Sequence, residues 1–163
     1  MRRIVVIIFV LAAVASCVSI DCPVQNQVEY IFALKKPTGG TDTMGIDTLS
    51  VWAHRVGRKD TLLINRLCGV KATSFSVSAS HMLEEDSLFT LLTDTTKQRW
   101  LDTICIQKTN HPHFESVDCK ATYFHTITAV TTTSHGIDSI SINNKEVNYD
   151  PTETFYLYLK ANR

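Results

Sequence analysis

The sequence predicts an all-β fold, more specifically an immunoglobulin-like two-sheet β-sandwich of about seven to nine strands. After residue 22, apolar residues alternate with other residues at a period of two, as they do in strands that bury one face. Turn-forming residues separate these segments, which is typical of short strands joined by tight connections. No segment of this region carries the apolar stripe of an amphipathic helix.

The predicted strands follow one another closely along the chain. In the first of them, Val28, Tyr30, Phe32 and Leu34 share one face, because successive strand residues point to opposite sides of a sheet. The strands that we expect cover residues 27–34, 46–53, 60–65, 72–79, 86–93, 100–107, 121–131, 137–142 and 153–160.

Two pairs of these strands are expected to form hairpins. Residues 46–53 and 60–65 are joined by a short polar segment, and residues 86–93 and 100–107 are joined by another. Short polar connections of this kind favour antiparallel pairing of the two strands that they link.

Three segments between the strands are expected to lack strand structure. Residues 35–45 contain Pro and Gly and are predicted to be a loop. Residues 109–120 are predicted to be a second loop, interrupted by Pro112. Residues 80–86 are compatible with one short helical turn.

A short motif recurs, in which Asp is followed by Ser or Thr and then by an aliphatic residue. An Asp side chain suits a turn because it caps nearby backbone N–H groups, so each copy is interpreted as the entry to a strand. The irregular spacing of the copies excludes a repeat fold, and the scattered Asp residues lack the dense loop that a calcium site needs. The copies begin at Asp47, Asp60, Asp102 and Asp138, with a looser one at Asp86.

The first residues have the pattern of an export signal. Arg2 and Arg3 precede an apolar run over residues 4–14, which is too short to span a bilayer, since that takes roughly 20 apolar residues. The segment Val14-Ala15-Ser16-Cys17 is similar to a lipobox, which implies that Cys17 becomes the lipidated first residue. Ala13-Val14-Ala15 also fits an ordinary signal-peptidase site. We expect residues 1–16 to be a lipoprotein signal peptide, 17–26 a lipid anchor with a short tether, and 27–163 the β-sandwich domain.

The odd number of cysteines agrees with lipidation of one of them. The chain has five cysteines, and lipidation of one leaves four, which allow three pairings. We favour a disulfide between Cys22 and Cys119, because each follows an Asp and lies just outside a predicted strand. Pairing of Cys22 with Cys68 or Cys105, and free thiols, stay open as alternatives.

Several sequence blocks resemble a known family. The blocks "DTLSV", "LLINR", "GVKATSFSV", "HPHFESVDC", "YFHTITAV" and "IDSISINNKEVNYD" occur in that order. They resemble a domain-of-unknown-function family of small Gram-negative envelope lipoproteins. The resemblance implies a lipid-anchored all-β domain without an assigned activity, and it supplies no catalytic residues.

Composition and motifs argue against several functions. The formal net charge is zero, so there is no electrostatic footprint for nucleic acid. There is no GxSxG elbow, HExxH or CxxC motif, and no phosphate-binding glycine loop. The carboxylates at residues 84–85 and 115–118 are sequence neighbours rather than partners across a cleft. We expect no enzyme activity and no cofactor. A metal site built from His111, His113 and His125 is a weaker alternative.

Binding through exposed aromatic side chains is the function that we expect. Tyr156 and Tyr158 share the face opposite Phe155, Leu157 and Leu159, so they are a possible binding surface. The full set of candidates is Trp52, Trp100, Tyr123, Tyr149, Tyr156 and Tyr158.

The expected function is therefore that of a lipid-anchored binding or scaffolding module for an envelope protein partner, with a glycan-binding surface lipoprotein as the alternative. Residues 18–21 lack the acidic cluster that resembles a surface-export signal. We therefore expect attachment to the outer membrane with the domain facing the periplasm.

Overall fold

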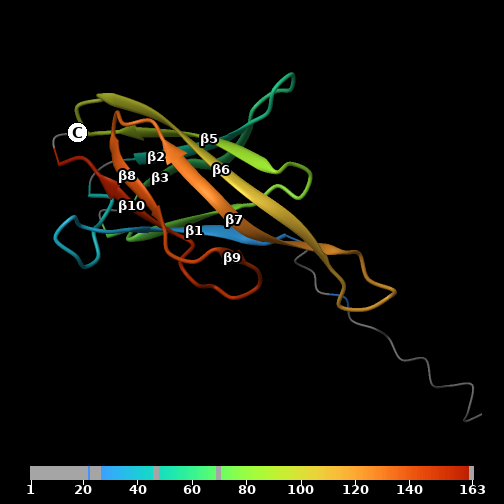
Figure 1. Ribbon diagram of the computed structural model, residues 1–163. Coiled ribbons are helices and arrows are strands. Elements are labelled where there is room, and N and C mark those ends of the chain that lie inside the picture. Colours follow the sequence, from blue (N-terminus) through green and yellow to red (C-terminus); the bar gives the residue numbers. More distant parts are fainter. Residues whose placement is uncertain (1–21, 23–26, 46–47, 69–70, 162–163) are drawn as a thin grey trace, which may run out of the picture.

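The computed structural model describes residues 22, 27–45, 48–68 and 71–161, which form two packed β-sheets without a helix (Figure 1). The all-β, two-sheet sandwich predicted from the sequence is thus confirmed. The described strands are β1 (Glu29–Leu34), β2 (Thr48–His54), β3 (Thr61–Cys68), β4 (Ser74–Ser78), β5 (Glu85–Thr93), β6 (Arg99–His113), β7 (Thr122–Thr132), β8 (Ile137–Ile142), β9 (Glu146–Val147) and β10 (Phe155–Leu159).

In this part of the chain there is one strand more than the upper limit expected, because β9 is only two residues long and shows no alternation to predict it from. Within the same residues, no helix is long and apolar enough to cross a membrane.

The smaller sheet has the strand order β4-β1-β10-β8, and the larger one has the order β3-β2-β5-β6-β7-β9. The first and last strands, β1 and β10, lie side by side and parallel in the middle of the smaller sheet. The predicted hairpins are confirmed, since β2 pairs with β3 and β5 with β6 in antiparallel register.

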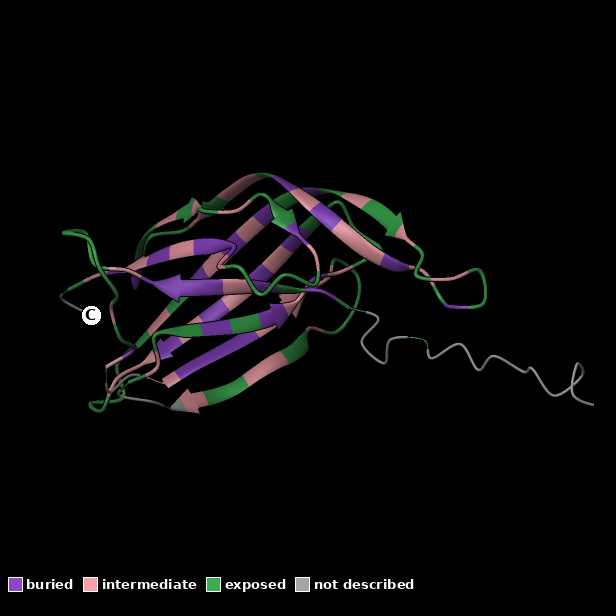
Figure 2. Ribbon diagram, turned by 90° about the horizontal axis from the view of Figure 1, so that it is seen from below, coloured by how far each residue is buried: buried purple, intermediate pink, exposed green. Residues whose placement is uncertain are grey.

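The core lies between the two sheets. Buried and more exposed residues alternate along β5 and β10, as Figure 2 shows by the bands of colour on the strands. In the smaller sheet, the Phe32 ring stacks on that of Phe75 at a centroid distance of 4.8 Å and lies 5.0 Å from that of Phe155. Val51, Ile104 and other fully buried aliphatic residues face them from the larger sheet.

Strand β6 is longer than the sequence predicts. The expectation of a loop over residues 109–120 is wrong for residues 109–113, which pair with residues 122–126 of β7. The pairing of β5 with β6 stops at Gln107, so this extension has a partner strand on one side only. Pro112 is tolerated there because this part of β6 is an edge, where no strand on the β5 side needs a hydrogen bond from the backbone N–H that Pro lacks. We call residues 109–113 and 122–126 the arm.

The residues before β5 also differ from expectation. Residues 80–86 form no helical turn: His81, Met82 and Glu84 lie in a bend, and β5 begins at Glu85. The side chain of Lys108 holds the bend through its backbone carbonyls, as described below, which removes the i to i+4 bonding that a helical turn needs.

The strands run between two ends of the sandwich, which carry different connections (Figure 1). At the disulfide end lie the β2–β3 turn (residues 55–60), the bend before β5 (79–84), and the arm with its tip (114–121). At the loop end lie residues 35–45, 94–98 and 133–136.

Candidate functional site

The outer surface of the larger sheet carries an open groove with a volume of about 680 Å³. Its apolar lining comes from β2, β5 and β6, in the form of Trp52, Phe89, Leu91 and Leu101. Trp52 lies directly opposite Phe89 across β2 and β5, and Leu91 lies opposite Leu101 across β5 and β6. Leu101 is 55% exposed.

The edge strand β3 continues this surface. Leu62, which is 45% exposed, is the cross-strand neighbour of Trp52. We call Trp52, Leu62, Phe89, Leu91 and Leu101 the apolar face. Such a face on an antiparallel sheet is unusual, because the side away from the core is normally polar.

Charged side chains line the margin of the groove. Lys59, Asp60 and Arg99 border the apolar lining. Asp60 is held in place by His54, whose Nδ1 lies 2.8 Å from the Asp60 carboxylate, and the His54 ring lies 4.7 Å from that of Phe89. The groove therefore has an apolar centre and a margin with both signs of charge.

Trp52 is a candidate that the sequence predicts, whereas the rest of the apolar face is not predicted from it. The available signal was a loss of alternation in β5. Leu88 and Leu92 are buried in the core, yet the intervening Phe89 and Leu91 are also apolar. A strand that is apolar on both faces is typical of a sheet in which both faces are buried, one by the core and the other by a second contact.

The two tyrosines predicted as a binding surface lie on the outer face of the smaller sheet. Tyr156 and Tyr158 are half-buried, while Phe155, Leu157 and Leu159 face the core as expected. The Lys35 ammonium lies 4.6 Å from the centre of the Tyr156 ring and 2.9 Å from the Glu153 carboxylate. The hydrogen bond with Glu153 raises the pKa of Lys35. The neighbours of the two rings on β8 are Ser141 and Ser139.

The other candidate aromatic residues support the fold. Trp100 packs against the core. The Tyr123 ring stacks on that of His81 at 5.6 Å, which links the arm to the bend. The Tyr149 ring lies edge-on to that of Phe124 at 5.1 Å, and its hydroxyl donates to Thr122 Oγ1 at 2.8 Å.

The three histidines proposed as metal ligands do not converge. His111 and His113 lie two residues apart and share one face of the arm, whereas His125 is the partner of Asn110 and lies on the other face. Across the part of the chain that the structure describes, no three His, Cys, Asp or Glu side chains cluster in a way that could hold a metal ion.

The candidate carboxylates do not face one another across a cleft. Glu84 and Glu85 are exposed at the start of β5, and Glu115 Oε1 lies 3.1 Å from His113 Nε2. Asp118 is exposed on the arm tip.

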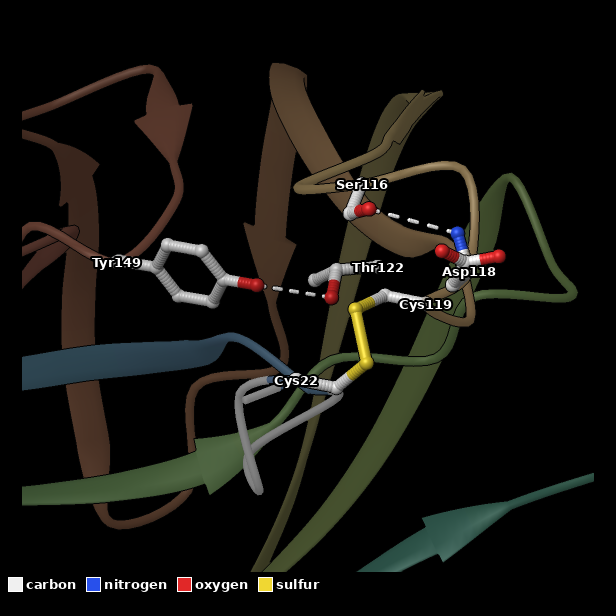
Figure 3. Close-up of a disulfide and its surroundings, with 6 residues drawn as sticks. All are labelled: Cys22, Ser116, Asp118, Cys119, Thr122 and Tyr149. Carbon is white, nitrogen blue, oxygen red and sulfur yellow. Dashed lines mark hydrogen bonds between the residues drawn. A yellow bond between two sulfur atoms is a disulfide. The ribbon is translucent and has the colours of Figure 1, made fainter. Parts of the chain in front are cut away.

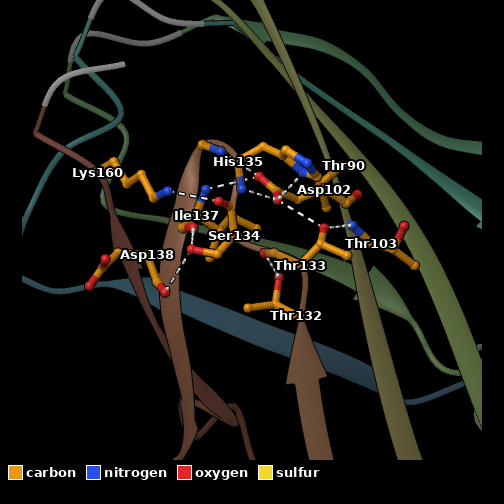
Figure 4. A network of polar contacts seen from close by, with 11 residues as sticks. Thr90, Asp102, Thr103, Thr132, Thr133, Ser134, His135, Ile137, Asp138 and Lys160 are labelled. Atoms are coloured by element: carbon orange, nitrogen blue, oxygen red, sulfur yellow. Dashed lines mark hydrogen bonds and ion pairs between the residues drawn. The ribbon is translucent and has the colours of Figure 1, made fainter.

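Asp102 was predicted to cap its own strand entry, and this is wrong. It lies inside β6, where it is 1% exposed, and it accepts hydrogen bonds from the connection between β7 and β8 (Figure 4). The donors are the backbone N–H groups of His135, Gly136 and Ile137, at 2.7, 2.7 and 2.9 Å. Burial alone would raise the pKa of Asp102, but these donors and the Thr133 hydroxyl hold it below its usual value.

A second buried charge lies six residues further along β6. Lys108 Nζ donates to the backbone carbonyls of Ser80 and Leu83 and to Asn110 Oδ1, the last two at 2.6 and 2.8 Å. It lies 3.6 Å from the Asp86 carboxylate. Burial lowers the pKa of Lys108.

Two further buried groups complete this cluster. The Tyr30 hydroxyl donates to Asp86 Oδ2 at 2.7 Å, and burial together with the Asp86 charge raises the pKa of Tyr30. His125 Nδ1 lies 2.7 Å from Asn110 Oδ1. Burial, aided by the nearby charge of Lys108, lowers the pKa of His125 to about 4.

A disulfide joins Cys22 to Cys119, with 5.5 Å between their Cα atoms (Figure 3). This is the pairing that the sequence favoured. It ties the segment before β1 to the base of the arm tip. Cys105 is a free thiol on β6. The predicted lipidation site, Cys17, lies outside the described residues.

The comparisons with known proteins yield one match. A family model with the description "Family of unknown function (DUF6452)" matches residues 48–159. No curated protein and no solved structure matches the chain.

Proposed function

The chain belongs to DUF6452, a family of unknown function, and on that premise we propose that it is a lipid-anchored envelope module that binds a protein partner through the apolar face. It acts by binding or scaffolding, without catalysis. The observation that carries this proposal is the groove of about 680 Å³ with its apolar centre and charged margin.

The composition of the groove favours a protein partner. Protein interfaces combine an apolar, aromatic-rich centre with a polar rim, and Trp and Arg are enriched among the residues that contribute most to binding. Trp52 supplies the aromatic centre, and Arg99 the rim, together with Lys59 and Asp60. A glycan could stack on Trp52, but Phe89, Leu91 and Leu101 beside it offer no hydrogen bonds to sugar hydroxyls, and only the margin of the groove does.

The polar clusters support a role without catalysis. Asp102 uses its hydrogen bonds to hold the backbone of residues 135–137, and Lys108 uses its own to hold the bend. Both are structural uses of a buried charge, because the backbone groups among their partners would otherwise be unsatisfied.

The N-terminal residues and the disulfide support an envelope location. The lipobox-like segment that ends at Cys17 implies a lipid anchor, and two acyl chains suffice for stable membrane attachment. Disulfides persist outside the cytoplasm, in agreement with the Cys22–Cys119 bridge. The lack of an acidic cluster in residues 18–21 favours the periplasmic side of the outer membrane.

The test is chemical crosslinking in cells that express the full chain, followed by purification and identification of the captured proteins. Leu101→Glu places a charge in the centre of the apolar face, and we expect it to lower capture of a specific partner by roughly tenfold or more. Ser76→Glu adds the same charge at an exposed position of β4, on the outer face of the smaller sheet. It is the matched control and should leave capture unchanged.

Two results would contradict the protein-binding proposal. One is equal capture by Leu101→Glu and by the unaltered protein, with both folded by circular dichroism. The other is binding to a glycan array that Trp52→Ala abolishes, which would favour the glycan alternative. Lipidation is tested separately, by the intact mass of the protein and of Cys17→Ser.

A further inference from the structure

Three connections at the disulfide end together expose five large apolar side chains. They are Val56 on the β2–β3 turn, Met82 and Leu83 on the bend, and Phe114 and Val117 on the arm tip. Val117 is 97% exposed and Val56 is 93% exposed. The connections of the loop end, residues 35–45, 94–98 and 133–136, expose no large apolar side chain.

The bend lies between the other two connections, and its Met82 and Leu83 line one hollow with Val56 of the β2–β3 turn. Lys108 and Asn110 bind the backbone of the bend, through the carbonyl of Leu83 in both cases. The His81–Tyr123 stack joins the bend to the arm. In Figure 1 the three connections lie at the same end of the sandwich, with the β2–β3 turn at its upper side and the arm tip at its lower side.

The disulfide limits how far the predicted lipid anchor can lie from this surface. Cys17 and Cys22 are five residues apart in the sequence, and a fully extended chain spans at most about 18 Å over that length. The Cα atoms of Cys22 and Cys119 are 5.5 Å apart. A lipid on Cys17 would therefore hold the bilayer within reach of the arm tip, which is closed by Cys119.

We propose that the disulfide end docks on the bilayer surface, with the apolar side chains of the three connections inserted at the boundary between headgroups and acyl chains. This inference rests on the proposed lipid anchor, and it adds the orientation of the domain. The lipid supplies the attachment, and the docked connections prevent the domain from swinging about its tether. The apolar face then points sideways along the membrane, where a neighbouring envelope protein can reach it.

The charges of this end indicate what kind of membrane contact to expect. Arg55 and Arg58 flank Val56, whereas Glu115 and Asp118 flank Val117. Because the two signs occur together, insertion of apolar side chains is the main contribution, and attraction to anionic lipid is small. Docking should therefore occur on phosphatidylcholine alone and should change little with salt.

The test uses the full-length lipidated protein in phosphatidylcholine vesicles, with the photoreactive residue p-benzoylphenylalanine at one position. A probe in place of Val117 should form roughly tenfold more lipid adduct, by mass spectrometry, than a probe in place of Thr95 at the exposed turn of the loop end. The double substitution Val56→Ser with Phe114→Ser should lower the adduct at position 117, and Leu101→Ser on the apolar face should not.

The intact mass of the same samples distinguishes the two proposals. If Cys17 carries lipid and the probes at positions 117 and 95 form equal amounts of lipid adduct, docking is wrong while the anchor stands. If Cys17 carries no lipid, the anchor is wrong, and docking is decided by whether added vesicles still give adduct at position 117. Adducts to protein in place of lipid, in cells, would overturn the docking proposal.

Discussion

The two ends of the sandwich are each held by a buried charge from β6, and the two charges have opposite signs. At the loop end, Asp102 accepts hydrogen bonds from the backbone N–H groups of residues 135–137. At the disulfide end, Lys108 donates hydrogen bonds to the backbone carbonyls of residues 80 and 83. A carboxylate only accepts hydrogen bonds and an ammonium only donates them. The sign of the buried charge therefore decides whether backbone N–H groups or backbone carbonyls point toward it. This in turn determines the backbone conformation of each connection.

The consequence differs between the ends. At the loop end the backbone turns toward Asp102, and the connections present polar side chains such as the 65%-exposed His135. At the disulfide end the carbonyls of the bend turn toward Lys108, and Met82, beside them, is left exposed. Each of the following predictions weakens one end and uses the other as its reference.

Removal of the disulfide should have the largest effect. The bridge closes a loop of 97 residues, and chain entropy predicts a loss of about 4–5 kcal/mol in the free energy of unfolding for Cys22→Ser with Cys119→Ser. Urea unfolding measures the loss. Hydrogen exchange should rise more at the arm tip than at residues 135–137. Equal loss of protection at both ends would contradict a local role for the bridge.

Lys108→Met should lower the free energy of unfolding by about 4 kcal/mol. The substitution leaves the carbonyls of Ser80 and Leu83 without their donor and the Asp86 carboxylate without its nearby cation, and breaking a buried charged network is strongly destabilising. Thermal unfolding measures the effect, with Lys120→Met on the exposed arm tip as the control. A loss under about 1 kcal/mol would show that water replaces Lys108.

Asp102→Asn should lower the free energy of unfolding by about 2–3 kcal/mol, as measured by thermal unfolding. The loss is smaller than for Lys108→Met because the amide oxygen can still accept part of the backbone hydrogen bonds. The amide NH2 group cannot accept hydrogen bonds, so the backbone N–H groups that faced the replaced oxygen are left unsatisfied. Asp138→Asn is the matched control, since Asp138 begins another copy of the same motif but is exposed at the start of β8. Equal loss in the two variants would contradict the assignment of the loop end to Asp102.

Acidification should weaken the disulfide end by a smaller amount. The pKa of His125 is lowered from 6.5 to about 4 in the folded chain. The unfolded state therefore binds the proton first, and the stability that His125 contributes above pH 6.5 is lost as the pH falls toward 4. A loss on the order of 1–3 kcal/mol is expected. Urea unfolding across this range should show a flatter pH dependence in His125→Gln. An unchanged slope in that variant would contradict the prediction.

Much of the fold followed from the sequence because strand alternation is a local property. The segment Ile137–Ile142 was predicted with the limits that the structure has, since Ile140 and Ile142 alternate with serines after the turn-forming Asp138. Both hairpins followed in the same way. The pairing of Cys22 with Cys119 could be favoured because both residues lie outside alternating segments.

The arm and the apolar face were missed because their causes lie elsewhere in the chain. Residues 109–113 become a strand because β7 pairs with them, in spite of Pro112. Phe89 and Leu91 form a surface because β2 and β6 bring Trp52 and Leu101 beside them. The alternation within each segment does not show which strands will lie beside it.

The sequence by itself determined where most of the strands lie, which side of them faces the core, and which cysteine ends the lipobox-like segment. The tertiary structure alone decided what the charged residues of β6 do. Asp102 has the same local motif as Asp138, yet one is buried and the other exposed. The physical reason is that the field and solvation of a charged group depend on the groups packed around it. Here those groups lie more than 20 residues away, on connections that only the assembled sheets bring into contact.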